Sequence, residues 1–200
     1  MKKVIISVLL AFLTVTSVSA VSYRGFCELG PGLTRGGGES SVEYHISTTH
    51  GVQLNSHFFI GAGASYSYSE FGEKVFNYLG IESVGVYGTV RFDLGVIKKW
   101  SPYVSVDLGG KVFEDYDSGD DIDVSKFLFN LNFGVRIRMG RTTGLNLGFK
   151  YTPFKVNGSG YKYVSIPYEE NGNIYYGGKE VPFSASASVC VIAFSVGFDF

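Results

Sequence analysis

The stretch that decides the fold lies at residues 188–200 and reads Ser188-Val189-Cys190-Val191-Ile192-Ala193-Phe194-Ser195-Val196-Gly197-Phe198-Asp199-Phe200. Because strand side chains alternate between two faces, the odd-numbered positions put small or polar residues on one face. The even-numbered positions put mainly aliphatic and aromatic residues on the other face. A strand of this kind that ends on a phenylalanine is unusual in a soluble domain, and we expect it where a last strand closes a membrane barrel.

The first residues are typical of a secretory signal. Lys2 and Lys3 precede an apolar run at residues 4–15, and Val18-Ser19-Ala20 offers small residues to a signal peptidase. The run is too short for a spanning helix, which needs roughly 20 apolar residues. No cysteine follows the expected cut, so a lipoprotein anchor is not expected. The sequence therefore predicts a signal peptide at 1–20 and one domain at 21–200.

Composition narrows the class further. The chain has a formal net charge of −1, charged residues are 18% of it, and no basic patch occurs, so nucleic acid is not an expected partner. Its 27 glycines and 16% aromatic residues, with only 5 prolines, suit long twisted strands joined by tight turns. No cofactor and no metal are expected.

Period-two patterning recurs in about eight segments, at residues 22–33, 40–50, 57–69, 81–94, 101–114, 126–139, 144–154 and 184–200. Each segment is at least as long as the roughly 9–11 residues that a tilted strand needs to cross a bilayer. The pattern predicts an all-β fold, an antiparallel up-and-down transmembrane β-barrel of about eight strands. Closure would satisfy every backbone group in lipid.

Alternation alone does not say which face is inside, because a secreted lipocalin-like carrier would also alternate. The polar face here is rich in Gly, Ser and Asn, which suit a narrow lumen. Short connections are expected near 51–56, 95–100 and 140–143, and longer ones at 34–39, 70–80, 115–125 and 155–183. That asymmetry is typical of outer-membrane barrels. The early Gly-x-Trp of lipocalins is missing, since the single tryptophan is Trp100. We therefore expect the apolar stripes to face lipid.

The expected signal peptide, the strand pattern and the ending Phe194, Val196, Phe198 and Phe200 resemble the small OmpA/OmpX-type outer-membrane barrels. Residues 23–30, Tyr-Arg-Gly-Phe-Cys-Glu-Leu-Gly, look like the first strand of the outer membrane protein beta-barrel family. The resemblance implies a bacterial outer-membrane location and contact with outer-membrane lipid. It also implies that the barrel-assembly machinery reads the terminal strand ending in Phe200. The OmpA-like periplasmic domain is not expected, because the sequence stops at the barrel.

Charged residues and one histidine on the polar face form the first candidate site. The set comprises Arg24, Glu28, Glu43, His45, Arg91, Asp93, Asp107, Lys111, Arg136, Arg138 and Lys150. An eight-stranded lumen is just wide enough to be filled by side chains, and buried charges must be paired. We expect a salt-bridged core that plugs the barrel. The alternative is a hydrated ion path lined by Arg136, Arg138 and Lys150.

Two further clusters could carry chemistry. Residues 115–123 are rich in aspartate and could bind calcium, but Gly119 stands where an EF-hand needs a ligand, so a solvated acidic loop is favoured. A lipid A-modifying enzyme would need a histidine near the outer leaflet. His50 and His57 flank a turn at the opposite end, and His45 shares a face with Glu43 and Ser47 without a Gly-x-Ser-x-Gly elbow. No catalytic residue is assigned.

Aromatic residues are expected to form two interfacial belts. One comprises Trp100, Tyr103, Phe198 and Phe200, and the other Tyr66, Tyr68, Phe113, Phe127 and Phe154. Cys27 and Cys190 fall on the apolar faces of the first and last strands, so a disulfide is conceivable. Two free thiols acting as small lipid-facing hydrophobic groups are favoured over it.

The long connection at 155–183 is rich in Tyr, Gly and Asn, which make an adaptable contact surface. It and the loop around 115–125 are candidates for binding an extracellular partner. The alternative for 155–183 is a two-strand extension of the barrel with a flexible tip at 169–172. The leading functional hypothesis is a non-enzymatic envelope protein, structural or interacting through its surface loops. A narrow channel, a lipid A-modifying enzyme and a secreted carrier are the alternatives.

Overall fold

The computed structural model describes residues 21–36, 39–71, 79–95, 97–117, 121–140, 143–170 and 173–200. The expected signal peptide at 1–20 lies outside these residues. Among the residues that the structure describes, no helix has the length and apolar character needed to cross a membrane.

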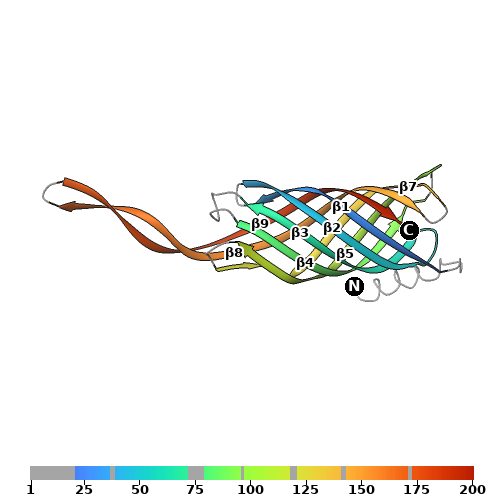
Figure 1. Ribbon diagram of the computed structural model, residues 1–200, viewed down its shortest axis with the longest axis horizontal. Coiled ribbons are helices and arrows are strands. Elements are labelled where there is room, and N and C mark those ends of the chain that lie inside the picture. Colours follow the sequence, from blue (N-terminus) through green and yellow to red (C-terminus); the bar gives the residue numbers. More distant parts are fainter. Residues whose placement is uncertain are drawn as a thin grey trace, which may run out of the picture.

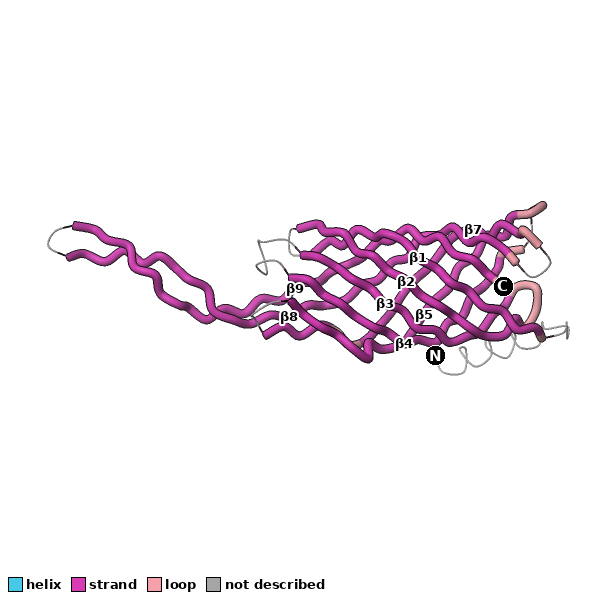
Figure 2. The backbone as a smooth tube through the Cα atoms, in the orientation of Figure 1, coloured by secondary structure: helices cyan, strands magenta, loops and turns pink. Residues whose placement is uncertain are grey.

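The described chain forms nine strands arranged as a closed barrel (Figures 1 and 2). They are β1 (Ser22–Gly36), β2 (Glu39–Gln53), β3 (Phe58–Phe71), β4 (Leu79–Asp93), β5 (Trp100–Asp117), β6 (Asp121–Val124), β7 (Phe127–Arg138), β8 (Gly144–Glu170) and β9 (Asn173–Asp199). Neighbours are antiparallel throughout, and β6 is a short strand that pairs only with β8. The remaining eight strands close the ring, which confirms the expected all-β antiparallel barrel.

The seam between β1 and β9 closes the ring. Phe26 lies opposite Asp199, and the pairing continues to Gly36 opposite Val189. At the end of the seam Gly25 and Phe200 exchange two backbone hydrogen bonds, with N–O distances of 2.9 and 3.0 Å. A closed ring leaves no unpaired sheet edge within the lipid, which is the condition for spanning a bilayer with strands.

The two ends of the barrel differ. One end, here called the turn end, carries the connections at 54–57, 94–99 and 139–143 and the C-terminal Phe200 (Figure 1). The other, the hairpin end, carries β8 and β9, each 27 residues long, which extend far beyond the barrel wall. Their pairing continues to Glu170 opposite Asn173. The expected loop at 155–183 is therefore wrong, and the alternative of a two-strand extension is confirmed.

The acidic segment is also more regular than a loop. Strand β5 continues to Asp117, and β6 begins at Asp121. Strand β6 then lies against β8, with Val124 opposite Val156. Residues 118–120, including Gly119, lie outside the described residues. The expected loop over 115–123 is therefore wrong at 115–117 and 121–123, which are strand, although Asp115 and Asp123 are exposed as expected of a solvated acidic segment.

The apolar stripes are on the outside, as the sequence analysis expects. Phe127 and Phe133 are 60% and 51% exposed, while Asn130 and Arg136 are 4% and 8% exposed. The reverse arrangement, with apolar side chains inside as in a soluble carrier, does not occur here. The outer surface presents leucine, valine, isoleucine and phenylalanine to the bilayer.

Two members of the expected aromatic belts face the lumen instead. Tyr103 is buried beneath Arg91, and the Phe154 ring lies under the Lys111 ammonium. Tyr103 shares strand parity with Ser105, and Phe154 shares it with Lys150, so alternation places both inside. Trp100, Phe198 and Phe200 do lie exposed on the outside.

The two cysteines are free. On the paired strands Cys27 lies opposite Phe198, whereas Cys190 lies opposite Arg35. Eight positions of β1 separate the two levels, or roughly 25 Å along the strand. The conceivable disulfide is therefore excluded by register, and the free-thiol interpretation holds.

Candidate functional site

Polar side chains from every wall strand converge in the lumen, and they divide it into a closed region and two small chambers. We name the closed region the plug, formed by Arg24, Arg91, Asp93, Arg136 and Asp199 at the turn end. The inner chamber lies beside the plug, and the outer chamber lies toward the hairpin end. Alternation along each strand delivers these groups to the interior while the opposite face contacts lipid.

The plug is a network of ion pairs that crosses the lumen. Arg24 Nη1 lies 3.0 Å from Asp93 Oδ2, and Arg24 Nη2 lies 3.1 Å from Asp199 Oδ2. Arg91 Nε lies 3.1 Å from Asp93 Oδ1, and Arg136 also pairs with Asp199. Asp199 has no exposed surface, so each of its ion pairs is fully desolvated on the acidic side. These contacts tie β1, β4, β7 and β9 together across the barrel.

Aromatic rings fill the space between the arginines. The Phe26 ring centre lies 4.5 Å from the Arg24 guanidinium carbon and 4.7 Å from that of Arg91. Tyr103 stacks on the other side of Arg91 at 3.6 Å. Phe59 has no exposed surface and meets Phe26 edge-on, with ring centres 4.9 Å apart. Cations over aromatic faces in a desolvated site add to the ion pairing, so this region is sealed by both.

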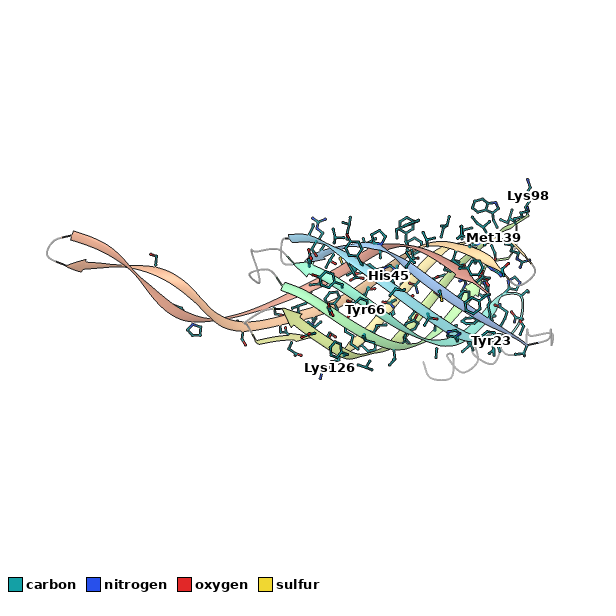
Figure 3. The ribbon with its side chains drawn as sticks, in the orientation of Figure 1. Tyr23, His45, Tyr66, Lys98, Lys126 and Met139 are labelled. Carbon is teal, nitrogen blue, oxygen red and sulfur yellow. The ribbon has the colours of Figure 1, made fainter. Side chains whose placement is uncertain are left out.

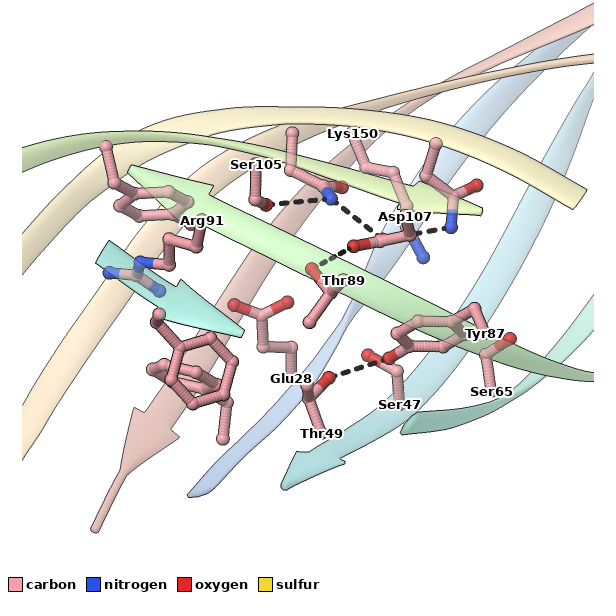
Figure 4. A pocket seen from close by; sticks show the side chains of 15 residues that line it. Glu28, Ser47, Thr49, Ser65, Tyr87, Thr89, Arg91, Ser105, Asp107 and Lys150 are labelled. Atoms are coloured by element: carbon pink, nitrogen blue, oxygen red, sulfur yellow. Dashed lines mark hydrogen bonds between the residues drawn. The ribbon is translucent and has the colours of Figure 1, made fainter. Parts of the chain in front are cut away.

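The inner chamber has a volume of about 30 Å³, room for about two waters. Its best-satisfied group is Asp107 (Figure 4), which accepts hydrogen bonds from Thr89 at 2.6 Å, Asn132 at 2.9 Å and Asn130 at 3.2 Å. Glu28 and Lys150 also line the chamber. Neither of them makes an ion pair within 4.0 Å among the described residues.

The outer chamber is slightly larger, with a volume of about 40 Å³. Ser69 donates a hydrogen bond to Glu43 at 3.1 Å, and Lys150 lines this chamber as well as the inner one. His45 is only 5% exposed, yet neither of its ring nitrogens has a hydrogen-bond partner within the described part of the chain. At the rim Lys111 pairs with Glu114 at 3.0 Å.

Beside the outer chamber, four buried aliphatic residues form a small apolar cluster. Ile81, Val124, Val156 and Val189 come from β4, β6, β8 and β9. Phe154 packs against them, and the acidic segment reaches this position because β6 pairs with β8. The cluster narrows the hairpin end of the lumen without any charged group.

Most of the charged residues that the sequence analysis expects in the lumen do face the lumen. Arg24, Arg91, Asp93 and Arg136 meet in the plug, while Glu28, Glu43, His45, Asp107, Lys111 and Lys150 line the two chambers. Arg138 does not, because β7 ends there and its side chain is exposed at the turn end. The alternative of an ion path lined by Arg136, Arg138 and Lys150 gains no support from this placement, because Arg136 lies in the plug, Lys150 lines the chambers and Arg138 is exposed at the turn end.

The charged set expected from the sequence omits Asp199, and no luminal role is expected there for the four buried aromatic residues Phe26, Phe59, Tyr87 and Tyr103, the last of which is expected in an interfacial belt. Strand alternation alone places these residues on the polar, lumen-facing side of their strands. Phe26 alternates with Arg24 and Glu28, for example, and Tyr87 with Gly85 and Thr89. A large ring on a polar stripe therefore marks a filled lumen rather than a lipid contact.

The histidines lie where the sequence analysis places them. His57 is exposed at the turn end, and its Nδ1 lies 2.8 Å from the Asp93 carbonyl oxygen. His50 faces outward at the same end and contacts the side chains of Thr48 and Tyr23. His45 shares the luminal face with Glu43 and Ser47, but its ring nitrogens bond to neither of them. The described residues include no group of three or more potential metal ligands.

Comparison with known proteins agrees with this architecture. Neisserial surface protein A superimposes with a TM-score of 0.55 at 12% identity, covering 90% of this chain and 98% of that one. The outer membrane protein AlkL, solved in lipid bilayers, gives a TM-score of 0.50 at 15% identity, covering 92% and 93%. No curated protein sequence matches. The model of the outer membrane protein beta-barrel domain matches residues 6–167. The chain belongs to this family and is a bacterial outer-membrane protein.

Proposed function

We propose that this protein is a non-enzymatic, non-conducting barrel that displays the β8–β9 hairpin at the cell surface for contact with a partner. In outer-membrane barrels the short turns face the periplasm and the long connections face outward. The turn end is then periplasmic and the hairpin end extracellular. The observation that carries the proposal is the contrast between a lumen sealed by the plug and a hairpin that leaves the barrel wall.

The hairpin has little support from the rest of the barrel. Strand β8 pairs with β7 through residues 144–151 and with β6 through 156–159, and β9 pairs with β1 only from Val189 onward. Within the described residues, β8 and β9 beyond these points pair only with each other. A free two-stranded ribbon is only marginally stable in water. Its sequence, rich in Tyr, Gly and Asn, suits an adaptable contact surface.

Protease treatment of intact cells tests the display. Added proteinase K is expected to cut within residues 160–188 and to leave the barrel as a heat-modifiable fragment. The matched variant lacks 158–185 and joins Asn157 to Ser186, which are opposite each other, through an Asn-Gly turn. It should assemble and resist the protease. A hairpin protected on intact cells but cut in lysates would contradict the proposal.

Photo-crosslinking in living cells tests the contact itself. A photoreactive residue at Ser165, which is exposed on the hairpin, should form adducts with a protein or glycan of the cell exterior. The same residue at Tyr44, exposed on the lipid-facing wall, is the control and should react with lipid alone. If Ser165 gave no adducts other than those seen at Tyr44, the proposed partner contact of the hairpin would be contradicted. A deletion strain should also keep its lipid A profile, as expected for a non-enzyme.

A narrow channel is the second candidate, and the two polar chambers favour it. Glu28 lines the inner chamber and Lys150 lines both, and neither makes an ion pair within 4.0 Å in the described chain. A conducting path would need the plug to open and the apolar cluster at the hairpin end to leave room for it. Recording across a planar bilayer separates this candidate from the first.

We also propose that the terminal strand is the signal for the assembly machinery. The Phe200 ring packs over Gly25, where an added Cβ would lie 2.7 Å from the ring, and it meets His50 edge-on. Deleting Phe200 should reduce assembled barrel in cells. Because the ring also supports the seam, refolding of the purified truncation into vesicles is the control. Equal losses in cells and in vitro would assign Phe200 a structural role only.

A further inference from the structure

The backbone edges of the β8–β9 hairpin are unpaired where the two strands leave the barrel as a twisted ribbon (Figure 1). On the side of β1, the pairing of β9 stops at Val189, because β1 ends at the opposite residue, Gly36. From there toward the tip, no other described strand pairs with that edge of β9. Its N–H and C=O groups are therefore available to another chain.

The hydrogen bonds at the seam show which residues of β9 direct their backbone groups to this edge. Phe200 exchanges both of its backbone bonds with Gly25 of β1, and in an antiparallel pair every second residue does so. The even-numbered residues of β9 therefore face β1. The register of β9 with β8 is unbroken from Asp199 to Asn173, so this direction is kept along the whole hairpin. Beyond the end of β1, the even-numbered residues point to the open edge.

A proline interrupts each edge of the ribbon. Pro182 is even-numbered, so the N–H that it lacks is one that would point to the open edge of β9. On β8 the Lys155 carbonyl accepts from the Ser125 N–H at 2.9 Å, so the odd-numbered residues of β8 point away from β9. Pro167 is odd-numbered and interrupts the β8 edge in the same way. Such prolines keep an exposed edge from pairing indiscriminately.

The part of the β9 edge nearest the barrel lacks this protection. Residues 183–188, Phe-Ser-Ala-Ser-Ala-Ser, contain neither a proline nor a charged residue. Ser184, Ser186 and Ser188 are exposed, and their backbone groups continue the row that bonds to β1. A strand added here would lie in line with β1, which is antiparallel to β9.

The edge of β8 is less open to an added strand. Strand β6 covers it as far as Ser159, which lies opposite Asp121. The residues that follow include Lys162, and the exposed Lys126 lies near the base of the hairpin (Figure 3). Lysine on an edge opposes pairing with another chain. The uncharged stretch of β9 is therefore the better site for strand addition.

We propose that residues 184–188 of β9 bind an extended segment of a partner protein, which adds to the sheet as an antiparallel strand in line with β1. The outward backbone groups of Ser184, Ser186 and Ser188 recur about every 7 Å, a spacing that another extended backbone matches. The main chain supplies the affinity, and the small serine side chains leave room for those of the partner. This inference rests on the surface display proposed above and names the class of partner.

Hydrogen exchange of the refolded full chain in nanodiscs tests the edge directly. In the free protein the amides of Ser184, Ser186 and Ser188 should exchange faster than those of Ala185 and Ala187, which face β8. A synthetic peptide of alternating threonine and valine should slow the three serine amides by roughly 10-fold. The same peptide N-methylated at every residue should slow none of them. Equal protection by both peptides, or by neither, would overturn the proposal.

Two variants test the edge in living cells, with the adducts at Ser165 as the measurement. Ser186→Pro removes the central outward N–H without removing a bond to β8, as Pro182 already does in the same strand, and should lower the adduct yield roughly 10-fold. The matched control Ser186→Ala keeps the N–H and loses only the hydroxyl that bonds to Asn157, so it should react like wild type. Pro182→Ala adds an outward N–H and should raise the yield.

The outcomes separate this inference from the display itself. Proteinase K should cut the hairpin equally in all variants, which shows that each one is displayed. If the adducts at Ser165 persist in Ser186→Pro, the hairpin contacts its partner elsewhere and the β9 edge is not the site. Equal loss in Ser186→Ala would assign the contact to the hydroxyl and overturn the proposal. Dimers of the refolded wild type that Ser186→Pro abolishes would assign the edge to a second copy and would overturn it as well.

Discussion

The plug and the outer chamber lie in one lumen, yet they differ in how densely their polar groups are paired. In the plug, three arginines and two aspartates are joined by ion pairs, and rings occupy the space between them. In the outer chamber His45 is just as buried but has no hydrogen-bond partner among the described residues. The turn end of the lumen is therefore rigid and filled, whereas the hairpin end leaves room for water.

The difference follows from side-chain size along the stripes. The turn-end positions carry arginine, phenylalanine and tyrosine, which reach across a narrow barrel and meet one another. The positions near the outer chamber carry short serines that bond to neighbours on the wall and leave the centre open: Ser67 bonds to Ser83 at 2.8 Å, and Ser69 bonds to Glu43 at 3.1 Å. Buried charge is therefore neutralised by ion pairs at the turn end, whereas the outer chamber keeps open space beside its polar groups.

The largest effect is expected from Asp199→Asn. This substitution removes the charge that Arg24 and Arg136 share and leaves both arginines buried without it. Breaking a buried ion pair costs about 3–5 kcal/mol, so the free energy of unfolding in vesicles, measured with urea, should fall by about that amount. A loss below about 1 kcal/mol would show that the plug is hydrated and does not hold the barrel together.

A somewhat smaller effect is expected from Phe59→Ala. Phe59 has no exposed surface and packs edge-on against Phe26, so its removal leaves a cavity in the plug. The free energy of unfolding should fall by about 3 kcal/mol. Phe59→Leu is the matched control, because it keeps most of the volume and should cost less than half as much. If both variants cost the same, the ring is not packed as described.

The smallest effect, with the opposite sign, is expected from His45→Leu in the outer chamber. Leucine fills a similar volume, and it removes two buried ring nitrogens that have no partner. An unsatisfied buried polar group costs about 1–3 kcal/mol, so unfolding by urea should require equal or slightly more denaturant. Destabilisation by more than about 1 kcal/mol would reveal a partner for His45 and would remove the contrast between the two regions.

The sequence predicts the barrel and the orientation of its stripes because alternation is a local property of each strand. That Phe127 and Asn130 lie on opposite faces follows from their own strand, without knowledge of the strands that pair with it. The pairing of Arg24 with Asp199 is not, because it depends on the register of β1 with β9 and on the narrow cross-section that brings Arg136 to the same carboxylate. Tyr103 is expected in an interfacial belt because tyrosine favours membrane interfaces, but the alternation of side chains along its strand places it in the lumen. The two-strand extension at 155–183 is only one of two alternatives in the sequence, because the glycines and prolines there also suit a loop.

The central claim is that the plug closes the lumen, and single-channel recording of refolded protein in a planar bilayer tests it most directly. Wild type should give no discrete conductance steps in concentrated potassium chloride. A variant with Asp199→Asn and Phe59→Ala, which removes one charge and one ring of the plug, should give small steps that wild type lacks. Steady, discrete steps from wild-type protein of the same size as those of the variant would contradict the account.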